Sequence, residues 1–421
     1  MTMSDRKRLL SNMASLFTLQ GANYVLPLVT LPYLVRVLGP EKFGLIAFAQ
    51  AFIQYFVVAT DYGFNLSATR DVAVHRDDLQ KLGEIISAVM AIKILLSLVG
   101  AGVLGLLTWT IPTFHRHWPL YLVVYLTVAG ATLFPTWLFQ GLERMRDITW
   151  MNMGTRLLTT AAIFIFVHKP QDYVLVAAIQ SLPVFLAAIP AWWVLRRGHA
   201  VPLQRPTIQA MREQIKGGWH VFLSTAAINV YTSSNTVVLG LIAGPVAVGY
   251  FSAASKISGA VLGLYQPINQ TLYPYVSTLF LKSKNIAIAF INKIYYGYIS
   301  AGLVMTIIVL IFGKDIILII AGADYLPAIS ILKCLALLPI ILTFGHIYGG
   351  LTMLPFGMTQ LFSRIVVTSM VVDLLLIYPL VLQLGALGAA MTTVLSEMCV
   401  SGLMIFMAKK HQLLTKQQVS A

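Results

Sequence analysis

Residues 85–109 read IISAVMAIKILLSLVGAGVLGLLTW, a run in which Lys93 is the one charged side chain. An α-helix needs about 20 consecutive apolar residues to cross the hydrocarbon core of a bilayer, so this run is long enough for a complete crossing. A strand of a membrane barrel uses only about 10 residues, in which polar and apolar side chains alternate. The stretch therefore predicts an integral membrane protein built from α-helices.

The rest of the chain has the same character. Its 421 residues are 58% hydrophobic and only 10% charged, with a mean hydropathy of +0.81. A soluble domain carries about 25% charged residues, so the bilayer is the expected solvent. The two cysteines, Cys334 and Cys399, lie in apolar runs, which favours neither a disulfide framework nor a metal cluster. We expect no metal and no cofactor, and the lack of any hydrolase, transferase or nucleotide-binding motif predicts that the chain is not an enzyme.

The apolar runs predict about twelve spans joined by short connectors. The first span follows Arg6, Lys7 and Arg8, and its apolar run is longer than that of a signal peptide and has no clear cleavage site, so we expect it to be retained. The spans lie near residues 12–36, 43–66, 84–109, 118–141, 150–168, 172–195, 217–241, 246–277, 291–312, 326–350, 359–382 and 385–408.

Basic residues predict how the chain is oriented. Most of the Lys and Arg residues lie in alternate connectors and at the termini, within residues 6–8, 70–81, 144–146, 196–216, 282–293 and 409–416. The other connectors hold only Lys42, Arg116, Lys169 and Lys314, with Arg36 at their edge. Because cytoplasmic loops carry the excess of Lys and Arg, we predict cytoplasmic termini. The net charge of +14 then reflects topology and attraction to lipid headgroups, and requires no nucleic-acid partner.

A short motif occurs twice. Gly39-Pro40 is followed by Gly44 and Ala49, and Gly244-Pro245 is followed by Gly249 and Ala254, always 205 residues apart. Gly-Pro is also a common turn dipeptide, but both copies lie in equivalent hairpins of the two halves of the chain. The motif therefore predicts two related six-helix lobes, at residues 1–200 and 217–421, joined by a basic cytoplasmic linker at 201–216. Transporters built from repeated bundles place substrate between them near the midplane.

Several ionisable residues lie deep within spans, where a charge costs about 2.5–3.5 kcal/mol and usually faces the protein interior. They are Asp61, Lys93, Lys256, Asp373 and Glu397. Arg36 lies nearer a span end, where extension of the side chain to the headgroups is an equally good explanation. Asp373 and Glu397 flank the turn at Leu384-Gly385 at similar depth, so they could share a proton or bind a cation between them, or each could pair with another polar neighbour.

Polar side chains form stripes on four spans. Gln50, Gln54 and Asp61 share one helical face, and so do Lys256, Gln266 and Gln270 on another span; Tyr231 and Asn235 share a face on a third, and the first span carries Asn23 beside two prolines. Polar and small residues also hold spans together. For Lys256 and Asp61 we favour a water-filled cavity, in which Lys93, Lys256, Arg36 and the amide and tyrosine side chains bind substrate, while Asp61, Asp373 and Glu397 serve ion coupling.

Residues 20–76 resemble the Wzx-type O-antigen flippases, in the polysaccharide-transporter branch of the MOP (multidrug/oligosaccharidyl-lipid/polysaccharide) exporter superfamily. The resemblance is carried by residues 20–28 (QGANYVLPL), 32–44 (PYLVRVLGPEKFG), 48–52 (FAQAF) and 61–70 (DYGFNLSATR). Beyond this stretch it consists of the twelve spans, the paired six-span lobes and the short loops.

The resemblance implies a flippase of the bacterial inner membrane. Such a protein moves undecaprenyl-diphosphate-linked oligosaccharide repeat units from the cytoplasmic to the periplasmic leaflet by alternating access. The implied partners are that lipid-linked oligosaccharide, membrane lipids, a proton or sodium ion for coupling, and the polysaccharide polymerase machinery. Lys and Arg in a low-dielectric cavity suit the pyrophosphate of this substrate.

Three other functions compete with this interpretation. A drug or metabolite antiporter of the same superfamily would share the fold. A polytopic polysaccharide polymerase would need a long periplasmic loop, which the short connectors do not provide. A scaffold without transport activity would not need deep ionisable residues in both halves.

Overall fold

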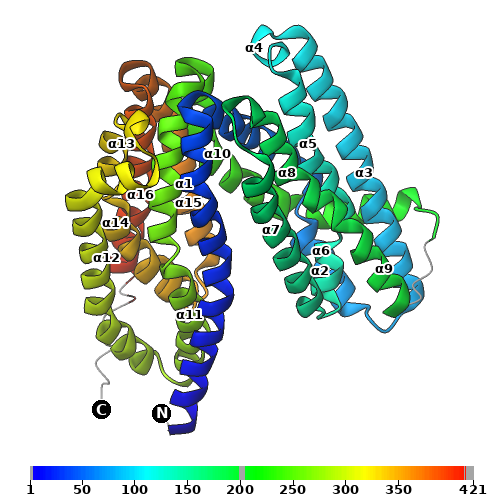
Figure 1. The fold of residues 1–421 in the computed structure, drawn as a ribbon. Helices are drawn as coiled ribbons and strands as arrows, with labels where there is room; N and C mark the ends of the chain where they lie inside the picture. Colours follow the sequence, from blue (N-terminus) through cyan, green and yellow to red (C-terminus); the bar gives the residue numbers. More distant parts are fainter. Residues whose placement is uncertain (1–2, 199–203, 412, 414–421) are drawn as a thin grey trace, which may run out of the picture. The chain divides into compact units, whose positions relative to one another are not determined.

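The computed structural model describes residues 3–198, 204–411 and 413, with side chains from Val29 onward except those of Met145, Arg146, Thr149 and residues 196–198. Its regular structure within these residues is entirely helical, which confirms the predicted class (Figure 1). In order, the elements are α1 (Met3–Asp61), α2 (Phe64–Val74), α3 (Leu79–Thr110), α4 (Pro112–His115), α5 (Trp118–Leu133), α6 (Thr136–Gly141), α7 (Met145–Phe166), η1 (Pro170–Asp172), α8 (Tyr173–Leu186), α9 (Ala188–Gly198), α10 (Ile208–Leu262), α11 (Tyr265–Lys282), α12 (Lys284–Ile320), η2 (Ala323–Tyr325), α13 (Ala328–Leu335), α14 (Leu338–Phe344), η3 (Gly345–Met353), α15 (Thr359–Leu384) and α16 (Ala386–Lys410).

The helices match the predicted spans. Among residues 29–198 and 204–411, nine helical segments are long and apolar enough to cross a membrane. Two of them, Val29–Val74 and Ile208–Leu262, are 46 and 55 residues long, more than twice the length that one crossing needs. A glycine break divides the underlying helix in each case, and α7 adds a further helix of 22 residues. Within the described residues the chain is thus an all-α, multi-pass membrane protein, and the two divisions together with α7 raise the nine segments to twelve helices.

Gly39 and Gly244 make the two breaks. Their backbone angles are almost equal, with φ 67° and ψ 174° at Gly39 and φ 80° and ψ 179° at Gly244. A positive φ is accessible to glycine at little cost because it has no Cβ. The proline that follows each glycine has a fixed φ suited to the first turn of a helix, so the chain turns sharply and a new helix begins at once. The two motif copies therefore have the same local structure.

The two motif copies also pack against each other. A Cβ added to Gly44 would overlap the carbonyl oxygen of Pro245, and one added to Gly249 would overlap the carbonyl oxygen of Pro40. Exchanging the copies exchanges these two contacts, which is the pattern of a two-fold related interface. The repeat of the motif is therefore a structural one, whereas the wider division into two six-helix lobes stays a prediction.

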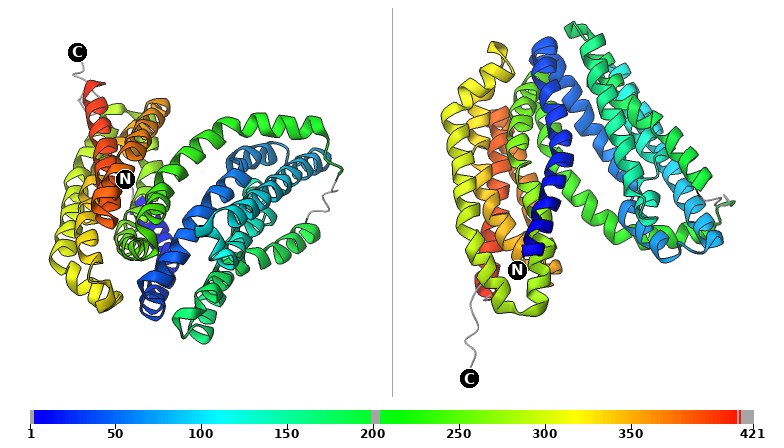
Figure 2. Two further views of the ribbon diagram at one scale, coloured as in Figure 1. Left: turned by 90° about the horizontal axis from the view of Figure 1, so that it is seen from above. Right: turned by 60° about the horizontal axis from the view of Figure 1, so that its bottom comes forward.

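The chain forms two compact units whose boundaries fall inside α1 and α10. Unit 1 comprises residues 1–44 and 238–421, and unit 2 comprises residues 45–237. In unit 1, α15 and α16 lie side by side in Figures 1 and 2, joined at Gly385, which has φ 55°. In unit 2, α5 lies against α3 and α8, and a core around Trp137 joins α2, α3, α6 and α9.

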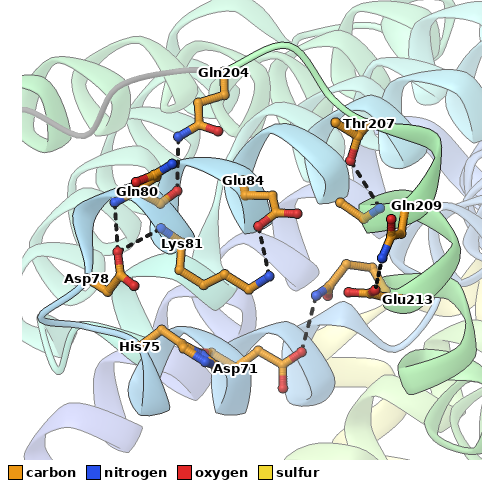
Figure 3. Close-up of polar contacts among 12 residues, drawn as sticks. Asp71, His75, Asp78, Gln80, Lys81, Glu84, Gln204, Thr207, Gln209 and Glu213 are labelled. Atoms are coloured by element: carbon orange, nitrogen blue, oxygen red, sulfur yellow. Dashed lines mark hydrogen bonds and ion pairs between the residues drawn. The ribbon is translucent and has the colours of Figure 1, made fainter.

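Polar contacts join the beginning of α10 to α2 and α3 within unit 2 (Figure 3). Asp78 caps α3 by accepting hydrogen bonds from the backbone N–H groups of Gln80 and Lys81, both at 3.0 Å. The side-chain amide of Gln204 donates to the carbonyl of Gln80 at 3.0 Å, and that of Gln214 donates to Asp71 at 3.2 Å. The predicted linker at residues 201–216 therefore includes the first turns of α10. Its role as the joint between two lobes stays a prediction.

Candidate functional site

The predicted stripe on α1 lies inside unit 2 and binds three different helices. Gln50 donates to Gln180 on α8 at 2.6 Å. Gln54 donates to Asn229 on α10 at 3.3 Å. Asp61, at the end of α1, forms an ion pair with Lys93 on α3, with 3.3 Å between carboxylate and ammonium. The stripe thus holds α1 to its neighbours, which is the role of polar side chains in helix association within a membrane.

Lys93 has its charge satisfied within the protein. Its side chain is 2% exposed and that of Asp61 is 15% exposed. The ammonium group also donates to the backbone carbonyl of Ala131 at 3.0 Å. Sequence reasoning gave Lys93 to substrate and Asp61 to ion coupling, and the structure brings the two together as one buried pair.

A cavity of about 200 Å³ lies beside this pair. Its polar lining comes from five elements: Thr60 and Asp61 on α1, Asn65 on α2, Lys93 on α3, Thr136 on α6 and Asn152 on α7. α1 ends at Asp61, and the next two residues, Tyr62 and Gly63, have positive φ. The chain turns at these two residues, and Asn65 on the following helix also lines the cavity. Sequence reasoning missed Asn65, Thr136 and Asn152, although Asn65 lies in the DYGFN stretch that carries the family resemblance.

Three further predicted substrate-binding residues are Tyr231, Asn235 and Asn23. Asn235 is buried on α10 and Tyr231 is half-buried one turn before it. Asn23 lies outside the described side chains, so its predicted role in the cavity stays a prediction.

The second stripe, in unit 1, is exposed along its length. Lys256 on α10 and Gln266 and Gln270 on α11 are all exposed, and a Cβ added to Gly259 would meet no atom within 4 Å. The ammonium of Lys256 lies 5.9 Å from the centre of the Phe43 ring, close enough for a cation–π contact. Ammonium and amide groups are costly in contact with lipid tails, so an exposed polar face within a membrane span indicates a water-filled space.

Arg36 is bound to the end of a helix. Its guanidinium donates to the carbonyls of Leu318, at 3.5 Å, and Ile319, in the last turn of α12. The last carbonyls of a helix lack partners within it and carry partial negative charge, so a cation stabilises them. Arg36 therefore has a structural contact that the sequence did not reveal.

Asp373 lies opposite Ser396 across the α15–α16 hairpin. Asp373 is fully buried and accepts a hydrogen bond of 3.0 Å from the Ser396 hydroxyl. Glu397 is the next residue and is half-buried. The two carboxylates thus lie at similar depth on adjacent helices. Their joint role in ion coupling stays a prediction.

A polar network in unit 1 was missed altogether. Tyr298 on α12 donates to the side-chain oxygen of Asn269 on α11 at 2.9 Å, and the amide nitrogen of Asn269 lies 3.1 Å from Nδ1 of His346. His346 belongs to η3, a π-helix, and π-helices are rare and frequent at functional sites. No spacing rule joins three residues on three helices, so no sequence signal could have found them.

This chain is similar in sequence to a protein family and to several named proteins. Residues 9–280 match the family model described as polysaccharide biosynthesis protein. A protein of Escherichia coli (strain K12) named as a candidate O-antigen transporter is 33% identical over 411 residues, covering 98% of this chain and 99% of its own length. A protein of Shigella dysenteriae with the same name is 30% identical over 94% of this chain and 98% of its own length.

Two solved structures share the fold. An inward-facing multidrug resistance MATE family transporter of the MOP superfamily superposes with a TM-score of 0.70 at 15% identity, covering 94% of this chain and 96% of its own. The lipid II flippase MurJ, in an inward closed conformation, superposes with a TM-score of 0.72 at 14% identity, covering 94% and 87%. Both are likenesses of fold. The family match over residues 9–280, together with relatives similar along nearly their whole length, establishes that this chain belongs to the polysaccharide biosynthesis protein family.

Proposed function

We propose that this chain is a flippase of the bacterial inner membrane, with both termini in the cytoplasm. It carries undecaprenyl-diphosphate-linked O-antigen repeat units from the cytoplasmic to the periplasmic leaflet by alternating access, coupled to a proton or sodium gradient. The observation that carries the proposal is the 33% identity, along 98% of this chain, to a protein named as a candidate O-antigen transporter. The polysaccharide polymerase machinery would receive the product.

The exposed stripe of unit 1 supports the proposed substrate chemistry. Lys256 is an exposed cation on an otherwise apolar span, and its ammonium can donate charge-assisted hydrogen bonds to a pyrophosphate. Gln266 and Gln270 carry amide donors and acceptors of the kind that sugar hydroxyls need. The polyprenyl tail is as apolar as lipid and can stay in the bilayer. These three residues are the ones we assign to the substrate path with structural support.

A deletion strain of the native host tests the proposed function. Without the protein, lipid-linked repeat units should accumulate in the cytoplasmic leaflet and surface polysaccharide should be lost. The two pools can be separated by whether an externally added, membrane-impermeant glycosidase reaches them. Normal surface polysaccharide in the deletion strain would rule out the flippase and favour a drug or metabolite antiporter.

Replacing Lys256 tests the substrate path. Lys256→Ala should reduce surface polysaccharide in the complemented strain by at least ~10-fold, because one charge-assisted contact to a phosphate contributes about 1.5–3 kcal/mol. Lys256→Arg keeps the charge and should restore most activity. Lys314→Ala is the matched control, since Lys314 is also exposed but lies near the far end of α12. Equal activity in the Lys256→Ala and Lys314→Ala strains, at equal amounts of inserted protein, would remove Lys256 from the path.

A further inference from the structure

The polar network around His346 occupies a distinct part of unit 1. It joins α11, α12 and η3, and its aromatic members belong to a cluster centred on Tyr265, Tyr298 and Ile347. The close packing of α12 on α14 makes the network possible, because Gly302 lies where any Cβ would overlap the Thr343 hydroxyl and come within 2.9 Å of the Tyr265 hydroxyl. The network is part of neither the Lys93–Asp61 pair nor the Asp373–Ser396 contact.

The hydrogen bonds define which way each group points. The Tyr298 hydroxyl donates to Oδ1 of Asn269, so the amide nitrogen of Asn269 faces His346 and donates to its Nδ1. An Nδ1 that accepts a hydrogen bond carries no proton, so the imidazole is neutral, with its hydrogen on Nε2. This is one internally consistent arrangement of the three side chains.

Adding a proton creates the second arrangement. A proton on Nδ1 makes the imidazolium a donor at both nitrogens, and its new N–H then faces the N–H of the Asn269 amide. A rotation of the amide by about 180° removes the conflict: Oδ1 then accepts from His346, and the amide nitrogen donates to the Tyr298 oxygen. A hydronium ion of the solvent supplies the proton, so one of its O–H bonds breaks as Nδ1–H forms, and the reverse step returns the proton to water.

Burial of the His346 ring opposes a charge there, and one aromatic contact favours it. The ring of Tyr265 lies 5.2 Å from that of His346, centre to centre, within the range in which an aromatic face attracts a cation. The Tyr265 hydroxyl is itself held by the carbonyl of Pro339 at 3.1 Å and by Thr343 at 2.9 Å, so the ring is fixed in place. His346 is partly exposed, which leaves a route for the proton.

Titratable groups lie on every helix packed against η3 except α14. Tyr265 on α11, Tyr298 and Tyr295 on α12 and Tyr348 on η3 itself are phenols, which are uncharged near neutral pH, and α14 (LPIILTF) has no titratable side chain. On the remaining two helices packed against η3, α15 carries Arg364, Asp373 and Tyr378, and α16 carries Glu397, Cys399, Lys409 and Lys410. Farther along, α11 carries Tyr273, Tyr275 and Lys282, and α12 carries Lys284, Lys293, Tyr296, Lys314 and Asp315. The carboxylates Asp373, Glu397 and Asp315 are thus the rival proton carriers.

We propose that His346, Asn269 and Tyr298 form a proton-binding site that couples a proton gradient to transport. Asn269 lies on the inner side of α11, next to Gln270, which belongs to the exposed stripe of the same helix. Pro274 removes a backbone donor from the interior of α11, which makes this helix easier to bend. Protonation beside Asn269 and substrate at Gln270 thereby bias the same helix, which is the physical requirement for coupling. The coupling part of this proposal rests on the proposed flippase function.

The site itself can be tested without any substrate. The protein in lipid nanodiscs, labelled with ¹⁵N at His and Asn, is titrated by NMR across the range in which histidines change charge, about pH 8 to pH 4. Signals that disappear in His346→Asn identify His346 among the eight histidines, and His220→Asn is the matched control on an exposed face of α10. We expect Nδ1 of His346 to change from unprotonated to protonated and the Asn269 amide signals to shift with the same midpoint.

Three results would overturn the site. His346 could fail to titrate, or could titrate without any change at Asn269, or the titration could disappear in Asp373→Asn combined with Glu397→Gln because the proton is held there. Tyr298→Phe is a further check, since it removes the hydroxyl that orients Asn269 and should change the midpoint of His346 while the protein stays folded.

Coupling needs a second measurement. Translocation of the host's lipid-linked repeat unit in proteoliposomes should rise at least ~3-fold under an imposed pH gradient, and should be unchanged when sodium is replaced by choline. His346→Asn should lose the response to the gradient, whereas His220→Asn, on an exposed face of α10, should respond like wild type. A His346→Asn variant that responds like wild type would overturn the coupling role. If wild type translocates no lipid-linked saccharide at all, the flippase function fails, whereas the NMR titration still decides the proton site.

Discussion

Gly249→Ala will prevent most of the protein from folding. The added methyl group would overlap the carbonyl oxygen of Pro40, and the atom in the way belongs to the backbone, which cannot rotate aside. The helix after Gly244 would have to move away from the loop at Gly39-Pro40. Overpacking costs about 1–3 kcal/mol even where side chains can adjust, so we expect the amount of monodisperse protein extracted from membranes to fall by at least ~10-fold. Size-exclusion chromatography of a fluorescent fusion measures this directly.

Gly44→Ala should have a similar effect, through the carbonyl of Pro245. Because both substitutions separate the same pair of segments, the double variant should lose less stability than the sum of the two single variants. Gly259→Ala and Gly217→Ala are the controls, since a Cβ at either position meets no atom within 4 Å. Wild-type amounts of folded Gly249→Ala would show that the two motifs do not pack against each other.

The second large effect concerns the buried ion pair in unit 2. Lys93→Met leaves the Asp61 carboxylate unpaired in a site that is only 15% exposed. Removal of one partner from a buried pair costs about 3–5 kcal/mol, because the remaining charge keeps its desolvation cost without its compensation. We therefore expect little folded Lys93→Met protein. The double variant Lys93→Met with Asp61→Asn contains no unpaired charge and should recover most of the folded protein.

The double variant distinguishes a role of the ion pair in transport from a role in folding. If the pair and the cavity beside it serve transport, as the sequence predicts for Lys93 and Asp61, the double variant will fold and yet fail to restore surface polysaccharide. Lys81→Met is the control on the same helix, because its pair with Glu84 is 38% and 33% exposed and such pairs contribute only about 0–1 kcal/mol. Normal surface polysaccharide from the double variant would show that the pair serves folding and not transport.

The predicted spans agree with the helices because hydropathy acts locally. The limits of α3 and α12, for example, depend on whether about 20 neighbouring residues can replace water by lipid, and that information is contiguous in the sequence. The breaks at Gly39 and Gly244 were equally local, since a glycine followed by proline permits one kind of turn.

The partners of polar side chains were not predictable in this way. Sequence spacing placed three polar residues on one face of α1. Their partners lie far along the chain, 130 residues away for Gln50, 175 for Gln54 and 32 for Asp61. Which helix arrives there depends on the packing of the whole unit. The same holds for Arg36, whose contact with the end of α12 could not be predicted and whose role in the cavity stays a prediction.

The sequence by itself determined that this chain is a multi-pass helical membrane protein, roughly where each helix begins and ends, and which family it resembles. Those properties follow from local composition and from short motifs. Only the tertiary structure decided that Gly44 and Gly249 face each other's proline carbonyls, that Lys93 neutralises Asp61, and that His346 meets Asn269 and Tyr298. Each of these contacts joins helices far apart in the chain, so it exists only after the helices have packed.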